Sequence, residues 1–171
     1  FNGNANDESG TGNNGTVNGA TLTTDRFGNA DAAYFFPGDI NNKIVVNYSS
    51  TLDFSPDYSV SLWAKFDAPW SFHQEDLVYK TPANWSCLEG WAVWMDRGVG
   101  NDPYLLGSHH GSSVNSCVVS QDTVGEYTEI NQWMHIVSVY QNDHLDLYLN
   151  GQFVSTSGQI ARRTSPAGAP S

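Results

Sequence analysis

The chain has 171 residues, of which 39% are hydrophobic and 13% aromatic, so its composition excludes an intrinsically disordered protein. With 18 acidic residues against 7 Lys and Arg, the net charge is −11, which disfavours binding to nucleic acid and suits cations and neutral sugars. No segment approaches the ~20 consecutive apolar residues that span a bilayer, so we expect no membrane insertion. The length fits one domain with a sizeable core.

The first elements are separated by turns rich in Gly, Asn, Asp and Pro. Residues 1–20 contain six Asn and five Gly and are too polar to form core, whereas strands are predicted at 32–36 and 43–48. In residues 58–66 the apolar side chains alternate with Ser and Lys, which is the period-2 pattern of a half-buried strand. Trp63 lies on the polar face of this pattern.

The remainder of the chain reads as a series of short strands without helical periodicity. The predicted strands are 76–80, 90–96, 103–107, 116–120, 133–141, 144–149 and 152–156. The last three form a meander, and Asn150-Gly151 inside it favours a two-residue type I′ turn, because both central residues need positive φ. These features predict an all-β antiparallel sandwich over residues 1–160, followed by a loop or linker-like tail over 161–171.

Two separated stretches carry a more specific pattern. The first stretch, near the start of the chain, contains Phe1-Asn2-Gly3-Asn4-Ala5-Asn6-Asp7, Asn14-Gly15-Thr16-Val17-Asn18-Gly19-Ala20 and Ala33-Tyr34-Phe35-Phe36. The second stretch, in the closing meander, contains Trp133-Met134-His135-Ile136-Val137 and Leu147-Tyr148-Leu149-Asn150-Gly151. Together they resemble laminin G-like, pentraxin-like domains of the concanavalin A-like lectin/glucanase superfamily. The resemblance implies a jelly-roll sandwich that is secreted or on the cell surface, often binds calcium, and recognises glycans or glycoproteins.

The sequence departs from this pattern at its end. The resemblance implies a further pair of strands after the meander, including an acidic Gly-x-Ile-Asp-type stretch, but the given sequence ends at Ser171. Either this copy lacks its C-terminal strands or another chain or fragment supplies them. We therefore expect a possible strand-donating partner or homo-oligomer, because an incomplete sheet exposes unpaired backbone.

Local chemistry and the resemblance together suggest a Ca2+ site in the N-terminal loop. Asp7 supplies a carboxylate, Asn14 a carboxamide, and Ser9 and Gly12 backbone oxygens, which are the ligand types that calcium prefers. The alternative is a solvated loop in which these side chains only cap turns.

Aromatic and polar residues in the middle of the chain suggest a sugar site, because ring faces stack on pyranoses and fixed polar groups bind hydroxyls. The candidates are Trp70, His73, Trp85, Asp96 and His109. For the adjacent pair His109-His110 we favour surface positions over metal binding, since neighbouring strand residues point to opposite faces.

Cys87 and Cys117 are predicted to form a disulfide, because both have polar flanks and the chain looks secreted; two buried thiols are the alternative. No catalytic motif is evident, and the Glu-x-Asp-x-x-Glu run that the resemblance associates with glucanases is missing. We therefore expect a carbohydrate-binding or adhesion module rather than an enzyme. A structural subunit that self-associates in an extracellular filament or surface layer is the alternative.

Overall fold

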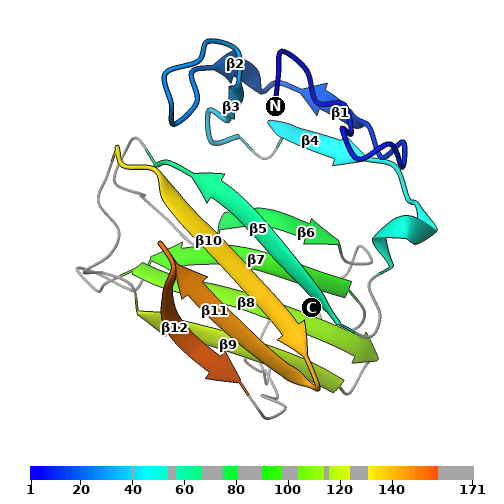
Figure 1. Ribbon diagram of the computed structural model, residues 1–171, viewed down its shortest axis with the longest axis vertical. Coiled ribbons are helices and arrows are strands. Elements are labelled where there is room, and N and C mark those ends of the chain that lie inside the picture. The colour runs from blue at the N-terminus through cyan, green and yellow to red at the C-terminus, as the bar shows by residue number, and fades with distance from the viewer. Residues whose placement is uncertain are drawn as a thin grey trace, which may run out of the picture. The chain divides into compact units, whose positions relative to one another are not determined.

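The structure is a computed structural model (Figure 1). It describes residues 1–39, 41–53, 57–66, 75–80, 90–97, 104–113, 116–123 and 131–157. These residues form antiparallel strands and one short 3-10 turn, which confirms the predicted all-β class. In this part of the chain, no helix has the length and apolar content needed to cross a membrane. The chain forms two compact units, Phe1–Phe54 and Ser55–Ser171.

The first unit contains two pairs of short strands, β1 with β4 and β2 with β3. Its elements are β1 (Gly15–Asn18), β2 (Thr21–Thr23), β3 (Ala33–Phe35), β4 (Lys43–Val46) and the 3-10 turn η1 (Ser50–Leu52). Among the described residues of this unit, Ala33 is the one apolar side chain that is buried, whereas Phe35, Val45 and Val46 are exposed. The unit is therefore organised by backbone pairing and turns more than by a hydrophobic core.

The second unit contains two four-stranded sheets. The front sheet has the order β12-β11-β10-β5, and its strands are β5 (Tyr58–Ala64), β10 (Met134–Gln141), β11 (His144–Leu149) and β12 (Gln152–Ser157). The turn after β11 has φ of 51° at Asn150 and 79° at Gly151, so the predicted meander and its left-handed turn are confirmed.

The back sheet has the order β6-β7-β8-β9. Its strands are β6 (Glu75–Lys80), β7 (Gly90–Arg97), β8 (Tyr104–Ser113) and β9 (Ser116–Thr123). β8 is longer than the predicted strand 103–107, because pairing with both neighbours continues through His109 and His110. The two sheets confirm the predicted antiparallel sandwich.

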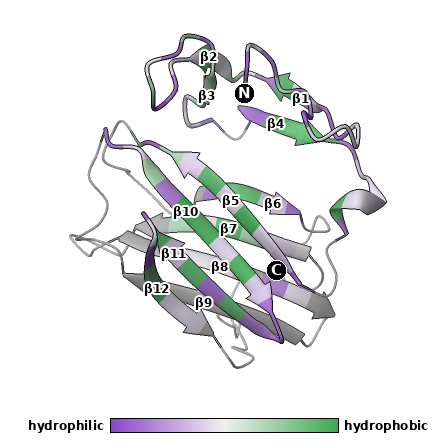
Figure 2. Ribbon diagram, viewed as in Figure 1, coloured by the Kyte–Doolittle hydropathy of each residue, from purple (hydrophilic) through white to green (hydrophobic). Residues whose placement is uncertain are grey.

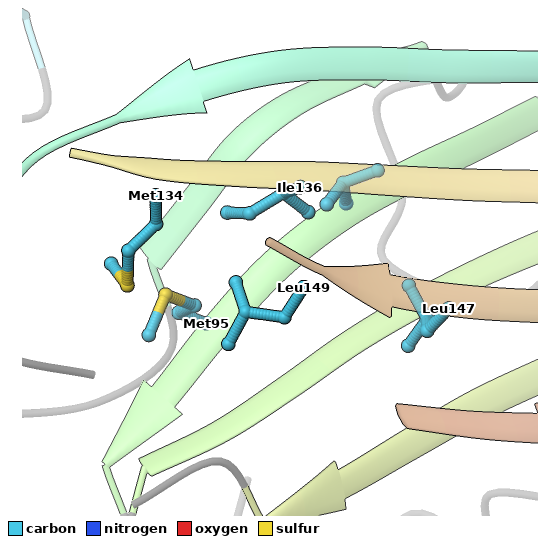
Figure 3. Close-up of a cluster of buried hydrophobic side chains, with 6 residues drawn as sticks. Met95, Met134, Ile136, Leu147 and Leu149 are labelled. Atoms are coloured by element: carbon cyan, nitrogen blue, oxygen red, sulfur yellow. The ribbon is translucent and has the colours of Figure 1, made fainter. Parts of the chain in front are cut away.

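The hydrophobic core lies between the two sheets. Along β10 and β11 every second residue is buried, and in β11 the buried residues are the hydrophobic ones (Figure 2). The main buried cluster consists of Val93, Met95, Met134, Ile136, Leu147 and Leu149 (Figure 3). Each such side chain contributes about 1.5–3 kcal/mol by leaving water, so this cluster fixes which face of each strand points inward.

A buried hydrogen bond also joins the sheets. The Ser108 hydroxyl of β8 donates to the Ala92 carbonyl at 2.8 Å, and Ser108 Oγ lies 2.8 Å from Ser138 Oγ of β10. Because the Ser108 proton is committed to Ala92, Ser138 is the donor in the second bond. The interior thus satisfies both hydroxyls, which sets the lateral position of one sheet against the other.

Candidate functional site

The outer face of the front sheet, which points away from the back sheet, carries exposed aromatic side chains. Leu62 and Val154 pack against the core, so the adjacent residues Trp63 and Phe153 point outward, as strand alternation requires. Trp63 is 42% exposed and Phe153 is 57% exposed. Trp63 belongs to β5 and Phe153 to β12, the two outer strands of the front sheet (Figure 1). Aromatic surface is therefore open to solvent at both sides of this face.

Neighbouring side chains hold the Trp63 indole in place. His135 is directly opposite Trp63 on β10, and the two rings stack with centroids 4.7 Å apart and planes 15° apart. The imidazole is itself fixed, since His135 Nε2 lies 2.8 Å from the Ser61 hydroxyl oxygen. Because the indole is already ordered, a ligand that stacks on it loses little side-chain entropy.

A second aromatic pair lies on the other side of the same face. Tyr148 of β11 is directly opposite Phe153 of β12, and their rings meet edge to face with centroids 5.7 Å apart. Val137 of β10 is in register with Tyr148 and lies between the two aromatic pairs. The face therefore combines aromatic edges with an aliphatic centre.

This outer face carries few charged side chains. Apart from histidine, those at outward positions of the described front-sheet strands and their immediate ends are Lys65, Asp57 and Asp146, so the face is slightly acidic. The Lys65 ammonium lies 5.6 Å from the centre of the Trp133 ring, a cation–π contact that extends the aromatic surface beyond the end of β5. An apolar face with few charges can hold a neutral ligand.

A second aromatic cluster lies inside the sandwich and has a structural role. The Tyr58 hydroxyl is 3.0 Å from His110 Nδ1, and His110 stacks on Tyr140 with ring centroids 3.8 Å apart. Burial raises the pKa of Tyr58 well above its usual value. Burial, together with donation of the Tyr140 hydroxyl to Asp143, raises the pKa of Tyr140 to about 12. Burial lowers the pKa of His110, and the Asp143 carboxylate opposes that change.

In the N-terminal loop, the side-chain oxygens of two expected calcium ligands, Asp7 and Asn14, accept hydrogen bonds from the loop itself. The Asp7 carboxylate accepts hydrogen bonds from the backbone and hydroxyl of Ser9, the Thr11 hydroxyl and the Asn13 backbone. These bonds, led by the one from the Ser9 hydroxyl, hold the pKa of Asp7 far below its usual range. The Asn14 carboxamide oxygen accepts from the Asp7 backbone N–H.

As folded, these residues do not fit a calcium site. Calcium takes six to eight oxygens, whereas both oxygens of the Asp7 carboxylate already accept loop donors and the Glu8 carboxylate accepts from the Asn2 carboxamide. Positive φ at Gly12 (81°) serves the turn that brings Thr11 and Asn13 to Asp7. Nowhere in the described ranges do three or more His, Cys, Asp or Glu side chains cluster as a metal site would need. The loop matches the alternative of side chains that cap turns.

The other predicted site residues remain predictions. Trp70, His73, Trp85 and Cys87 lie outside the described residues. In the back sheet, Asp96 is in register with Leu105, His109 with Ala92, and Cys117 with Gly111, but the side chains of these three candidates are not described. The predicted sugar site and the disulfide are therefore untested.

Sequence reasoning missed the face that carries Trp63 and Phe153. One signal was present: a tryptophan occupies a polar-face position of an otherwise regular alternating strand. A single exposed apolar side chain is ordinary, but a contiguous exposed aromatic surface marks an interaction site. The partners His135 and Ser61 could not be found from sequence, because they depend on the register between β5 and β10.

Comparison with known proteins gives the family. A laminin G family model, described as the concanavalin A-like lectin/glucanases superfamily, matches residues 38–170. The chain belongs to this family. No curated protein and no solved structure matches the chain significantly.

The matched part of this laminin G-like domain begins shortly before its fourth strand and covers the second unit as far as residue 170. The resemblance seen in the closing meander lies inside the match, whereas the Asn- and Gly-rich opening residues precede it. Membership of the superfamily supports a carbohydrate-binding or adhesion-type module, since domains of this kind bind glycans or proteins.

Proposed function

We propose that this laminin G-like domain is a non-catalytic, extracellular module that binds glycans or glycoproteins through the outer face of the front sheet. The observation that carries the proposal is the ordered, exposed Trp63 indole, held by His135 and placed beside the Ser61 hydroxyl. Aromatic rings bind the apolar face of a sugar, and neighbouring polar groups orient its hydroxyls.

The carboxyl groups on this face support the proposal that the domain binds glycans without hydrolysing them. Retaining glycoside hydrolysis uses two carboxyl groups about 5–5.5 Å apart. Asp146 is the one carboxylate at an outward strand position on the described front sheet. Calcium has no part in the proposal, since the residues expected to bind it do not fit as folded.

The test compares three proteins on a broad glycan array: the wild type, Trp63→Ala and Tyr79→Ala. Tyr79 is the matched control, because it is a 54% exposed aromatic residue on β6 of the back sheet. We expect Trp63→Ala to weaken binding about tenfold, since an aromatic contact is worth about 0.5–1.5 kcal/mol beyond area burial. Tyr79→Ala should bind as the wild type does, and EDTA should leave binding unchanged.

Equal loss of binding in both variants would contradict the placement of the site. If folded wild-type protein bound no glycan, the self-associating structural subunit would become the better hypothesis, and light scattering would test it directly. Because Trp63→Ala also removes the stacking on His135, thermal melts of all three proteins check that a loss of binding is not a loss of folding.

A further inference from the structure

The spacing of the exposed aromatic residues limits the size of the ligand. Trp63 and Phe153 lie on the two outer strands of the front sheet, three strand spacings apart. Across the sheet, Phe153 pairs with Tyr148, Tyr148 with Val137, and Val137 with Ser61. Trp63 follows Ser61 by two residues, so Trp63 and Phe153 are offset by two positions along the strand direction. Standard sheet dimensions then separate the two backbone positions by roughly 16 Å.

One sugar cannot contact both aromatic residues. A pyranose ring is about as wide as one strand-to-strand spacing, so a ligand that reaches from Trp63 to Phe153 must contain several linked sugars. Val137 and Tyr148 lie on the surface between these two residues, where their side chains can contact the middle of such a ligand. A terminal monosaccharide would leave one of the two exposed rings unused.

Charge limits the ligand further. The chain carries a net charge of −11, and at the outward positions described above Asp57 and Asp146 outnumber Lys65. A polyanionic ligand, such as a sulfated glycan, needs a cluster of basic side chains to offset repulsion from an acidic protein. The described strands of the front sheet place one Lys at this face and so supply no such cluster.

We infer that the ligand of this face is a neutral, extended glycan of at least three sugar units, bound across the strands from Trp63 to Phe153. The inference rests on the proposed function and specifies its substrate class. It assigns Phe153 and Trp63 to separate subsites, so the two residues contribute together only when the glycan is long enough to reach both.

The test is calorimetric titration of the full chain with neutral linear oligosaccharides, each series running from the monosaccharide to the hexasaccharide. Cello-, xylo-, manno- and chito-oligosaccharides serve as the panel, and heparin serves as the sulfated comparison. For the series that binds, affinity should rise at least about tenfold from the monosaccharide to the tetrasaccharide. Trp63→Ala and Phe153→Ala should each abolish most of this rise, whereas Tyr79→Ala should retain it.

Three results would overturn the inference, and they separate it from the proposed function. If the monosaccharide binds as tightly as the hexasaccharide and Trp63→Ala weakens both, the site is correct and the extended ligand is wrong. If heparin alone binds, the neutral class is wrong. If none of the probes binds to protein with a cooperative melting transition, the proposed function fails together with the inference.

Discussion

His110 and His135 both stack on aromatic rings but lie in opposite surroundings. His110 packs on both Tyr58 and Tyr140, where its ring helps to fill one end of the interior. His135 lies on the outer face, where its hydrogen bond to Ser61 and its stacking orient Trp63. The same residue type therefore stabilises the fold in one position and prepares a surface in the other.

The half-buried His110 should make the stability of the second unit depend on pH. Burial lowers the folded-state pKa of His110 below the unfolded value of about 6.5, so the unfolded chain binds the proton more readily. The contribution of neutral His110 to the free energy of unfolding is therefore complete above about pH 6.5 and is lost as the pH falls through the folded-state pKa. We expect urea denaturation to give a lower free energy of unfolding at about pH 5 than at about pH 7.

The matched variant is His110→Phe, which keeps an aromatic ring against Tyr140 but does not titrate. Its free energy of unfolding should change less between the two pH values than that of the wild type, whatever its absolute stability. Equal pH dependence of the two proteins would show that other groups cause the change.

At the scale of single elements, alternation and turn chemistry predicted the second unit well. β5, β10 and β11 show period-2 burial because each has one face on the core, and Asn150-Gly151 adopts the left-handed turn. β1 and β2 were missed because their side chains are mostly exposed and leave no apolar alternation. Their stability comes from backbone pairing with β4 and β3, which depends on partners distant in sequence.

Gly107 of β8 allows the Trp94 ring to pack on the neighbouring strand. The two residues are in register, and a Cβ added at Gly107 would overlap Cζ2 of the Trp94 indole. Trp94 is 7% exposed, so its ring cannot move away into solvent without losing buried area. We expect Gly107→Ala to lower the free energy of unfolding by about 1–3 kcal/mol, as overpacking does.

Gly151→Ala is the control, because a Cβ there meets nothing within 4 Å and the substitution acts through its φ of 79° alone. The double variant Gly107→Ala, Trp94→Phe should recover part of the loss caused by Gly107→Ala, since a smaller ring leaves room for the methyl group. Thermal melts of the four proteins measure this. No difference between Gly107→Ala and the wild type would contradict the close packing.

At the scale of the whole molecule, the family and the fold could be predicted, but the binding face could not. The closing meander carries the family pattern in contiguous residues, so a single sequence reveals it. The candidate face combines Trp63, His135 and Phe153 from strands far apart in sequence, and only the sheet order brings them to one surface. In the N-terminal loop, by contrast, the residue types suggested a metal site that the contacts do not support. The Asp7 carboxylate is a common metal ligand, but here it accepts hydrogen bonds from backbone N–H groups of its own turn.

The most direct measurement of the central claim is NMR mapping of the glycan that binds in the titrations. With assigned amide resonances, the account predicts that the largest shift changes on titration fall on β5, β10, β11 and β12, around Trp63, His135, Tyr148 and Phe153. Shift changes confined to the back sheet or to the N-terminal loop around Asp7, with Trp63 unaffected, would contradict it.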